Sequence, residues 1–170
     1  EDGTIIECKA KGKFRKLALS PLAGDIVETE FEQGTNVITK IHQRKNQFIR
    51  PPFANLDLLI LVISTTEPNP NYFVIDKMCA IAQHKNVEVA IAITKADLAH
   101  CDEIKEIYVK AGYNVFITGE EQTEQLEALK ALMKDKVFEE IYDVRDESSK
   151  EGIRIVIEVK KDRDPENLLN

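Results

Sequence analysis

The sequence predicts an α/β protein in which short strands precede a parallel sheet with flanking helices. Two apolar runs, Leu58 to Ser64 and Val87 to Thr94, are typical of strands that are covered on both faces, as in parallel sheets. Tyr72 to His84, which lies between these runs, has apolar residues at helical spacing. Before Arg50 the chain instead alternates short β-branched stretches with turn signals.

Residues 1–50 are predicted to form an incomplete barrel of the OB type. Strands are expected at Thr4 to Ala10, Asp25 to Phe31 and Val37 to Ile41. Short strands with long basic loops suggest a small barrel, and the OB fold is one such barrel of five strands. Because only three or four strands can be found, we expect an exposed strand edge that is open to pairing with a second copy.

Residues 51–137 are predicted to form the doubly wound sheet. Asn114 to Thr118 is expected to be a third strand, and Asp102 to Ala111 and Glu121 to Met133 are expected to be helices. Strands and helices alternate here, which implies right-handed crossovers. Near the end of the chain, Arg154 to Lys160 alternates apolar and polar residues, which is typical of a strand with one solvent-exposed face.

Charge is distributed unevenly along the chain, whose net charge is -7. Through Ile60 there are nine basic and eight acidic residues, and the remainder has fourteen basic and twenty-two acidic residues. A basic N-terminal face on an acidic protein predicts a local contact with nucleic acid, although composition alone also fits a solvated turn. The basic residues form two groups without acids, which are Lys9, Lys11, Lys13, Arg15 and Lys16, and then Lys40, Arg44, Lys45 and Arg50.

The composition argues against several classes of protein. No apolar run approaches the roughly 20 residues that a membrane span needs. The first residues show no secretory signal, so a cytoplasmic protein with no membrane partner is expected. Cys8, Cys79 and Cys101 form no Cys-x-x-Cys pair, which argues against a disulfide framework and a structural zinc site.

The motif Thr94-Lys95-Ala96-Asp97 follows the second predicted parallel strand. In guanine-nucleotide-binding proteins Asn/Thr-Lys-x-Asp occupies this place, where open α/β sheets bind ligands. The Asp accepts hydrogen bonds from the ring N–H and the exocyclic amine of guanine, which adenine cannot satisfy, and the Lys stem lies along the purine. Alternatively, the motif is a surface loop in which Asp97 caps the next helix. Thr118-Gly119, after the third strand, is a second candidate, where backbone amides would touch the base.

Four ordered blocks of sequence resemble the ribosome small-subunit-dependent GTPase A family. These blocks are Cys8 to Lys16, Ser20 to Val27, Arg44 to Asp57 and Ile93 to Leu98. The family is a circularly permuted GTPase with an N-terminal OB barrel, a GTPase domain whose guanine motif precedes the phosphate-binding loop, and a C-terminal zinc domain. The resemblance implies a partial OB barrel followed by a truncated P-loop-GTPase-like parallel sheet, in a late maturation factor of the small ribosomal subunit.

The resemblance also implies roles for individual residues. Thr94, Lys95 and Asp97 would recognise the guanine of GTP or GDP, and Thr118 and Gly119 would flank it. Ribosomal RNA would lie against Lys9, Lys11, Lys13, Arg15, Lys16, Arg44 and Lys45.

The chain departs from the family after Val137, where a phosphate-binding loop is expected. Phe138 to Ser148 stands in its place, and the chain contains no Gly-Lys-Ser/Thr motif. The Asp-x-x-Gly motif that organises magnesium and the cysteine-rich zinc module are also missing. Without groups that stabilise phosphoryl transfer, the chain is predicted not to hydrolyse GTP and to bind guanine nucleotide weakly or not at all.

The last segment, residues 138–170, has a likeness of its own. Asp143 to Lys160, continuing to Asn170, is similar to a segment of the A subunit of type IIA DNA topoisomerases such as gyrase. This likeness suggests, as an alternative to a maturation factor, an engineered or recombined chimera that was selected or built for folding and has no native activity. A topoisomerase fragment carrying a foreign domain is disfavoured by the residues covered. We expect Arg154 to Lys160 to complete the sheet where the family's phosphate-loop strand would lie.

Overall fold

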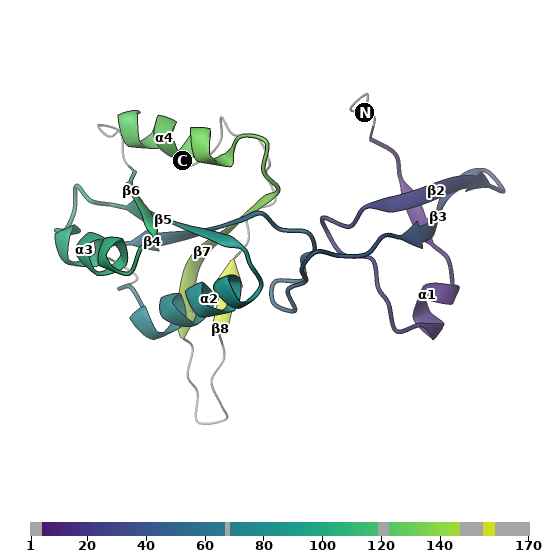
Figure 1. Cartoon of the computed structure of the whole chain (residues 1–170), viewed down its shortest axis with the longest axis horizontal. Coiled ribbons are helices and arrows are strands. Elements are labelled where there is room, and N and C mark those ends of the chain that lie inside the picture. The colour runs from purple at the N-terminus through teal and green to yellow at the C-terminus, as the bar shows by residue number, and fades with distance from the viewer. Residues whose placement is uncertain (1–4, 67–68, 119–122, 147–154, 159–170) are drawn as a thin grey trace. The chain divides into compact units, whose positions relative to one another are not determined.

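The computed structural model describes residues 5–66, 69–118, 123–146 and 155–158. The chain divides into two compact units, Glu1–Asn55 and Leu56–Asn170, which are drawn in Figure 1. Each unit has a sheet of its own.

The first unit contains a three-stranded sheet and one short helix. Strands β1 (Cys8–Ala10), β2 (Val27–Glu32) and β3 (Thr35–Ile41) stand in the order β1-β3-β2, and α1 spans Lys13–Lys16. β1 runs parallel to β3, whereas β2 and β3 form an antiparallel hairpin. In the described part of this unit β1 and β2 are the edge strands of the three-stranded sheet. The incomplete OB-type barrel and pairing with a second copy stay predictions.

The hairpin turn follows from its two central residues. Gln33 and Gly34 have positive φ values of 48° and 81°. Positive φ at both central positions matches the right-handed twist of the strands that a two-residue turn joins, and glycine adopts such values without strain. The turn signal in the sequence therefore sets the register of β2 against β3.

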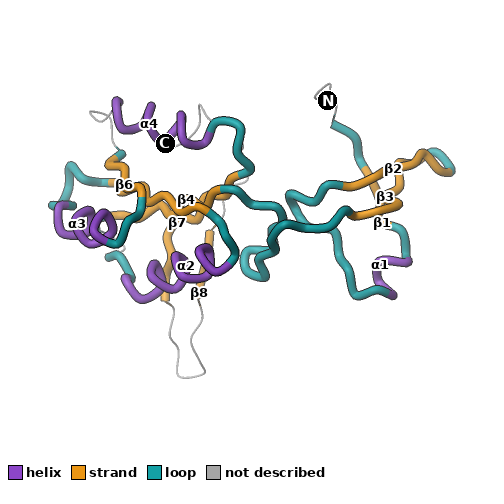
Figure 2. The backbone as a smooth tube through the Cα atoms, in the orientation of Figure 1, coloured by secondary structure: helices purple, strands orange, loops and turns teal. Residues whose placement is uncertain are grey.

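The second unit is built on a five-stranded sheet in the order β6-β5-β4-β7-β8. β4, β5, β6 and β7 are parallel, and β8 pairs antiparallel with β7 at the edge. Figure 2 shows α2 and α4 on opposite faces of this sheet, so the prediction of a parallel sheet with flanking helices is confirmed. The bounds of the elements are β4 Leu58–Ser64, α2 Tyr72–His84, β5 Glu88–Thr94, α3 Asp102–Lys110, β6 Asn114–Ile117, α4 Thr123–Met133, β7 Phe138–Asp146 and β8 Ile155–Glu158.

The second sheet contains a strand that the sequence did not predict. We expected Arg154 to Lys160 to complete the sheet, and β8 does join it, as the edge strand next to β7. The strand that pairs with β4 is β7. Glu139 and Glu140 interrupt the apolar pattern of β7, so periodicity does not identify it as a buried strand. Ile141 is nevertheless fully buried, which shows that β7 belongs to the core.

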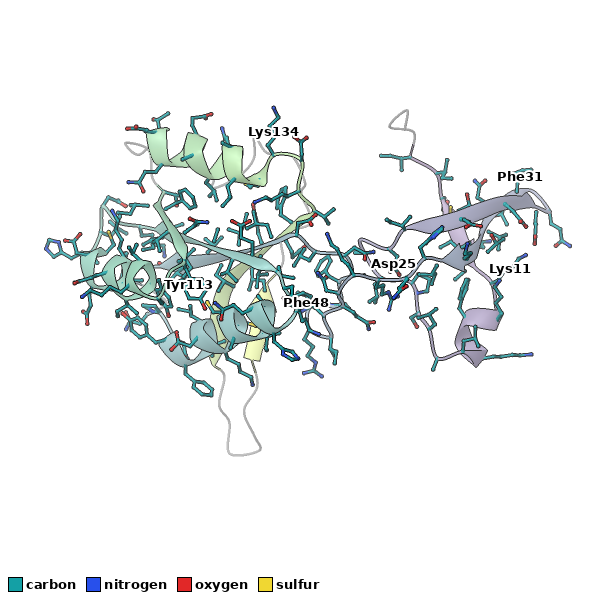
Figure 3. The ribbon with its side chains drawn as sticks, in the orientation of Figure 1. Lys11, Asp25, Phe31, Phe48, Tyr113 and Lys134 are labelled. Atoms are coloured by element: carbon teal, nitrogen blue, oxygen red, sulfur yellow. The ribbon has the colours of Figure 1, made fainter. Side chains whose placement is uncertain are left out.

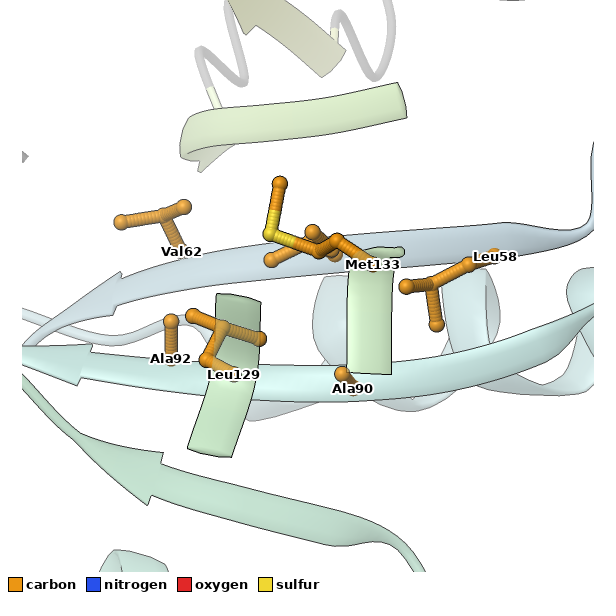
Figure 4. Packing of buried hydrophobic residues seen from close by; sticks show 7 residues of the cluster. Leu58, Val62, Ala90, Ala92, Leu129 and Met133 are labelled. Atoms are coloured by element: carbon orange, nitrogen blue, oxygen red, sulfur yellow. The ribbon is translucent and has the colours of Figure 1, made fainter. Parts of the chain in front are cut away.

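The core of this unit lies between α4 and one face of the sheet. Leu58, Ile60 and Val62 alternate along β4 and point to the same face, where Leu129 and Met133 of α4 pack on them. Figure 4 shows these side chains with Ala90 and Ala92 of β5, whose small size lets the helix come close to the sheet. The intervening residues of both strands are also buried, since α2 covers the other face. This burial on two faces explains why the strands are apolar at nearly every position.

Among the described helices, none is both long and apolar enough to span a bilayer.

Candidate functional site

Three neighbouring parallel strands end at the same edge of the second sheet. Ser64 of β4 pairs with Thr94 of β5, and Ile93 pairs with Ile117 of β6. The Thr94-Lys95-Ala96-Asp97 motif and Thr118 thus emerge side by side at the carboxyl ends of the strands. Open α/β sheets bind their ligands at this edge.

The residues after β5 form a tight turn that presents Asp97. The N–H of Leu98 donates a hydrogen bond to the carbonyl oxygen of Lys95 at 3.0 Å, and Lys95 itself has a positive φ of 56°. Asp97 is exposed, and its carboxylate has no hydrogen-bond or ion-pair partner in the described part of the chain. An exposed carboxylate with unused acceptor sites is suited to bind a ligand that carries two N–H donors.

The alternative interpretation, that Asp97 caps the next helix, does not agree with the structure. α3 begins at Asp102, its N-cap residue is Cys101, and no side chain caps it. Asp97 therefore lies before the capping position, and no helix accounts for its side chain.

The two threonines of the predicted site anchor the strand ends. The hydroxyl of Thr94 donates to the carbonyl oxygen of Ile63 at 3.3 Å, which ties β5 to β4. Thr118 is 2 % exposed, and its N–H and hydroxyl both donate to the carbonyl oxygen of Ile93, at 2.8 and 3.1 Å. These two bonds fix the position of Thr118, directly after β6, against Ile93 of β5. Gly119 lies outside the described residues.

Within the described ranges, no three or more histidine, cysteine or acidic side chains gather closely enough to hold a metal ion.

The basic residues of the first unit differ in what surrounds them. Lys9, Lys13 and Lys16 are exposed, and the ammonium group of Lys13 lies 5.4 Å from the ring centroid of Phe14. Lys11 instead donates a hydrogen bond to Glu32 at 2.7 Å, and this bond raises the pKa of Lys11. The backbone of Arg15 lies in α1, and the side chain of Lys45 is exposed.

Arg44 is placed differently from the other predicted RNA contacts. Its guanidinium forms a bidentate pair with Asp25, with Nε–Oδ1 at 2.7 Å and Nη2–Oδ2 at 2.8 Å. It also donates to the carbonyl oxygen of Ser20 and to Oε1 of Gln47. The side chains of Arg44 and Asp25 are 11 % and 2 % exposed, so this cation is enclosed in the first unit. The labelled Asp25 marks the place in Figure 3.

The pKa of Asp25 reflects this enclosure. Burial by itself would raise the pKa, but hydrogen bonds from Arg44 and from the N–H of Leu22 favour the ionised carboxylate. These bonds outweigh burial and hold the pKa of Asp25 below its usual value. The ion pair is therefore a structural element of the loop that leads into β2.

Comparison with known proteins assigns the family. A model described as the RsgA GTPase matches residues 41–139, and one described as the RsgA N-terminal domain matches residues 1–38. The chain belongs to the RsgA GTPase family. The family resemblance inferred from the sequence is thereby confirmed, and the RsgA models cover both units in part.

Several RsgA relatives are similar over most of this chain. The small ribosomal subunit biogenesis GTPase RsgA of Caldanaerobacter subterraneus subsp. tengcongensis is 39 % identical over 78 % of the chain and 46 % of that relative. The protein of the same name from Alkaliphilus metalliredigens is 36 % identical over 78 % of the chain and 47 % of its own length. The chain thus spans about half the length of the curated relatives it matches.

Two solved structures share the fold over most of this chain. YjeQ from Thermotoga maritima superposes with a TM-score of 0.66 at 32 % identity, covering 81 % of this chain and 52 % of that one. YloQ, described as a circularly permuted GTPase, gives a TM-score of 0.65 at 29 % identity, covering 84 % and 53 %. The RsgA family models end at residue 139, and the likeness of the following residues to gyrase, with the chimera it suggests, stays a prediction.

Proposed function

We propose that this chain acts in small-ribosomal-subunit biogenesis by binding ribosomal RNA through its first unit and the guanine base of GTP or GDP through its second unit. The names of the RsgA relatives support the process. The observation that carries the nucleotide proposal is the exposed carboxylate of Asp97, which has no partner among the described residues and stands at the carboxyl edge of a parallel sheet.

The residues at this edge fit a guanine base. Asp97 would accept hydrogen bonds from the ring N–H and from the exocyclic amine, and the stem of Lys95 would lie along the purine. Thr94 and Thr118 would hold the two strand ends in place beneath the base, since their hydroxyls already bond to the sheet. The proposed guanine set is completed by Gly119.

Hydrolysis of GTP is not part of the proposal. A phosphate-binding loop joins a strand to a helix and carries a Gly-Lys-Ser/Thr motif, whose lysine neutralises the phosphates. No such motif occurs in this sequence. We therefore propose weak nucleotide binding through the base alone, and the second candidate is a recombined chain that has no native activity.

Changing Asp97 to asparagine is expected to exchange guanine for xanthine as the preferred base. Xanthine carries an oxygen where guanine carries the exocyclic amine, so the amide of Asp97→Asn can donate to it while still accepting from the ring N–H. We expect GDP affinity to fall about tenfold or more, which is the loss of one hydrogen bond to a charged group, and affinity for xanthosine diphosphate to rise. Isothermal titration calorimetry on the full chain measures both.

Asp102→Asn is the matched control, because Asp102 is also exposed and lies at the start of α3. It should leave the order of base preference unchanged. Equal affinity of the unsubstituted chain for GDP and ADP would contradict guanine recognition, and absence of all nucleotide and RNA binding would favour the second candidate.

Ribosomal RNA binding is proposed for the exposed cations Lys9, Lys13 and Lys16, together with Lys11, Arg15 and Lys45. Arg44 is omitted because its guanidinium is bound to Asp25. Replacing Lys9, Lys13 and Lys16 by glutamine should weaken binding to small-subunit RNA and reduce the slope of log affinity against log salt by about 2 to 3, since each lost phosphate contact contributes roughly 0.7 to 0.9.

A triple variant of equal charge change provides the control for this prediction. Lys77, Lys110 and Lys134 are exposed on the second unit, and their replacement by glutamine should leave the salt slope close to that of the unsubstituted chain. Filter binding over a range of salt concentrations gives the slopes. The same reduction in both triple variants would mean that only net charge matters.

A further inference from the structure

We infer that Thr65 is a positioning residue for the turn that presents Asp97, and so sets how well the site recognises the exocyclic amine of guanine. This inference rests on the proposed function. Thr65 follows β4 directly, is 9 % exposed, and lies outside the Thr94–Asp97 motif and the four blocks that resemble the family.

Two hydrogen bonds join Thr65 to the start of the turn. Its hydroxyl donates to the carbonyl oxygen of Lys95 at 2.6 Å, and its N–H donates to the carbonyl oxygen of Thr94 at 3.2 Å. The residue after β4 is thereby attached to the carbonyl group of the last residue of β5 and to that of the residue that follows it. This connection continues the pairing of β4 with β5 past the point where the strands end.

The carbonyl group of Lys95 is the element that couples Thr65 to Asp97. It also accepts the hydrogen bond from the N–H of Leu98 at 3.0 Å, which closes the turn around Asp97. A hydroxyl and an amide therefore both hold the orientation of a single peptide plane. Rotation of that plane would break the bond from Leu98 and change the backbone dihedral angles that direct the Asp97 carboxylate.

Lys95 needs such support because of its backbone conformation. Its φ of 56° lies in the left-handed region, which is sterically unfavourable for a residue that carries a Cβ atom. The ammonium group of Lys95 also donates to the carbonyl oxygen of Thr66 at 3.3 Å, so the residues after β4 hold Lys95 by its backbone and by its side chain. Strained conformations of this kind persist where surrounding contacts determine them.

The two hydrogen bonds that guanine offers differ in their sensitivity to this orientation. A carboxylate that accepts from both the ring N–H and the amine must lie in the plane of the base, whereas one bond tolerates a tilted carboxylate. Loss of the Thr65 hydroxyl should therefore weaken discrimination between guanine and hypoxanthine, which lacks the amine, more than it weakens nucleotide affinity as a whole.

The test compares Thr65→Val, which removes the hydroxyl at constant shape, with Thr65→Ser, which keeps it. Affinities of the full chain for GDP and inosine diphosphate give a discrimination ratio. We expect the ratio of the unsubstituted chain to be about tenfold, from one hydrogen bond to a charged group, to fall severalfold in Thr65→Val, and to be retained in Thr65→Ser. Thr39→Val is a control, because the Thr39 hydroxyl also donates to a carbonyl oxygen but lies in the first unit.

A second readout needs no ligand. Hydrogen exchange of the Leu98 amide reports the bond that closes the turn, and it should be several times faster in Thr65→Val than in Thr65→Ser. An unchanged discrimination ratio in Thr65→Val, in a chain that does prefer GDP, overturns the role of Thr65 and leaves the proposed function standing. A chain that does not distinguish GDP from inosine diphosphate and ADP overturns the proposed function, and the role of Thr65 falls with it.

Discussion

Replacing Gly24 by alanine is expected to lower the free energy of unfolding of the first unit by more than about 4 kcal/mol, a loss that few single substitutions reach. A Cβ atom at this position would lie 2.1 Å from the carbonyl oxygen of Ala54. Gly24 also has a φ of 84°, which alanine adopts only with strain. Both the contact and the backbone conformation therefore oppose the side chain.

The backbone of Ala54 has little freedom to move away. Its N–H donates to the carbonyl oxygen of Ala23 at 2.9 Å, and Ala54 also bridges to Gln47. Next to it, the side-chain amide of Asn55 donates to the carbonyl oxygen of Gly24 at 2.9 Å. Hydrogen bonds thus join the segment around Gly24 to the segment around Ala54 on both sides of the clash. Moving the segments apart to relieve the clash would break these bonds.

The variant Gly34→Ala is the control that measures the cost of backbone strain without a steric clash. Gly34 has a similar φ of 81°, but nothing lies within 4 Å of a Cβ atom there, so its replacement should cost only about 1 to 2 kcal/mol. Because the chain has no tryptophan, hydrogen exchange of first-unit amides with increasing denaturant is the suitable measurement. Equal losses in the two variants would show that the Ala54 contact relaxes without cost.

Asp25→Asn is expected to destabilise the first unit by about 3 kcal/mol, the lower end of what breaking a buried ion pair costs. The amide cannot balance the charge of the enclosed Arg44, and it has one acceptor oxygen where the carboxylate has two. Asp25 now accepts from Arg44 twice and from the N–H of Leu22 at 2.7 Å. At least one of these donors is left without its acceptor in the variant.

The same pair gives the first unit a defined pH dependence. The pKa of Asp25 is lower in the folded chain than its ordinary value of 3.8, so its ionisation stabilises the fold fully above that value. This contribution disappears as the pH falls through the lower, folded pKa. The stability difference between the unsubstituted chain and Asp25→Asn should therefore be constant near neutral pH and shrink below about pH 4.

Glu30→Gln serves as the control for Asp25→Asn, since the Glu30 side chain is well exposed and its nearest cation is 4.0 Å away. It should change the free energy of unfolding by less than about 1 kcal/mol, as exposed ion pairs do. A difference for Asp25→Asn that persists undiminished at pH 2 would contradict the role given to its charge.

Sequence periodicity predicted much of the second unit because burial on two faces imposes a local signal. β4 and β5 are apolar at nearly every position, and the expected strands agree closely with their observed bounds. The strand β7 was not predicted from the sequence, because Glu139 and Glu140 interrupt its apolar residues. Its place beside β4 follows from pairing between residues about eighty positions apart, which periodicity does not encode.

The residues of the candidate site differ in the same way: some belong to a local motif, and others depend on partners that are distant in sequence. Asp97 was identified from a motif of four consecutive residues, and Thr65 was not, because its partner Lys95 is thirty positions away. Arg44 was grouped with exposed lysines for its charge, whereas the structure encloses it with Asp25, nineteen positions distant. Local spacing thus determined β4, β5, the family motifs and the motif that carries Asp97. Only the tertiary structure decided which charges are exposed and which backbone groups are held, because both depend on partners that folding brings from distant parts of the chain.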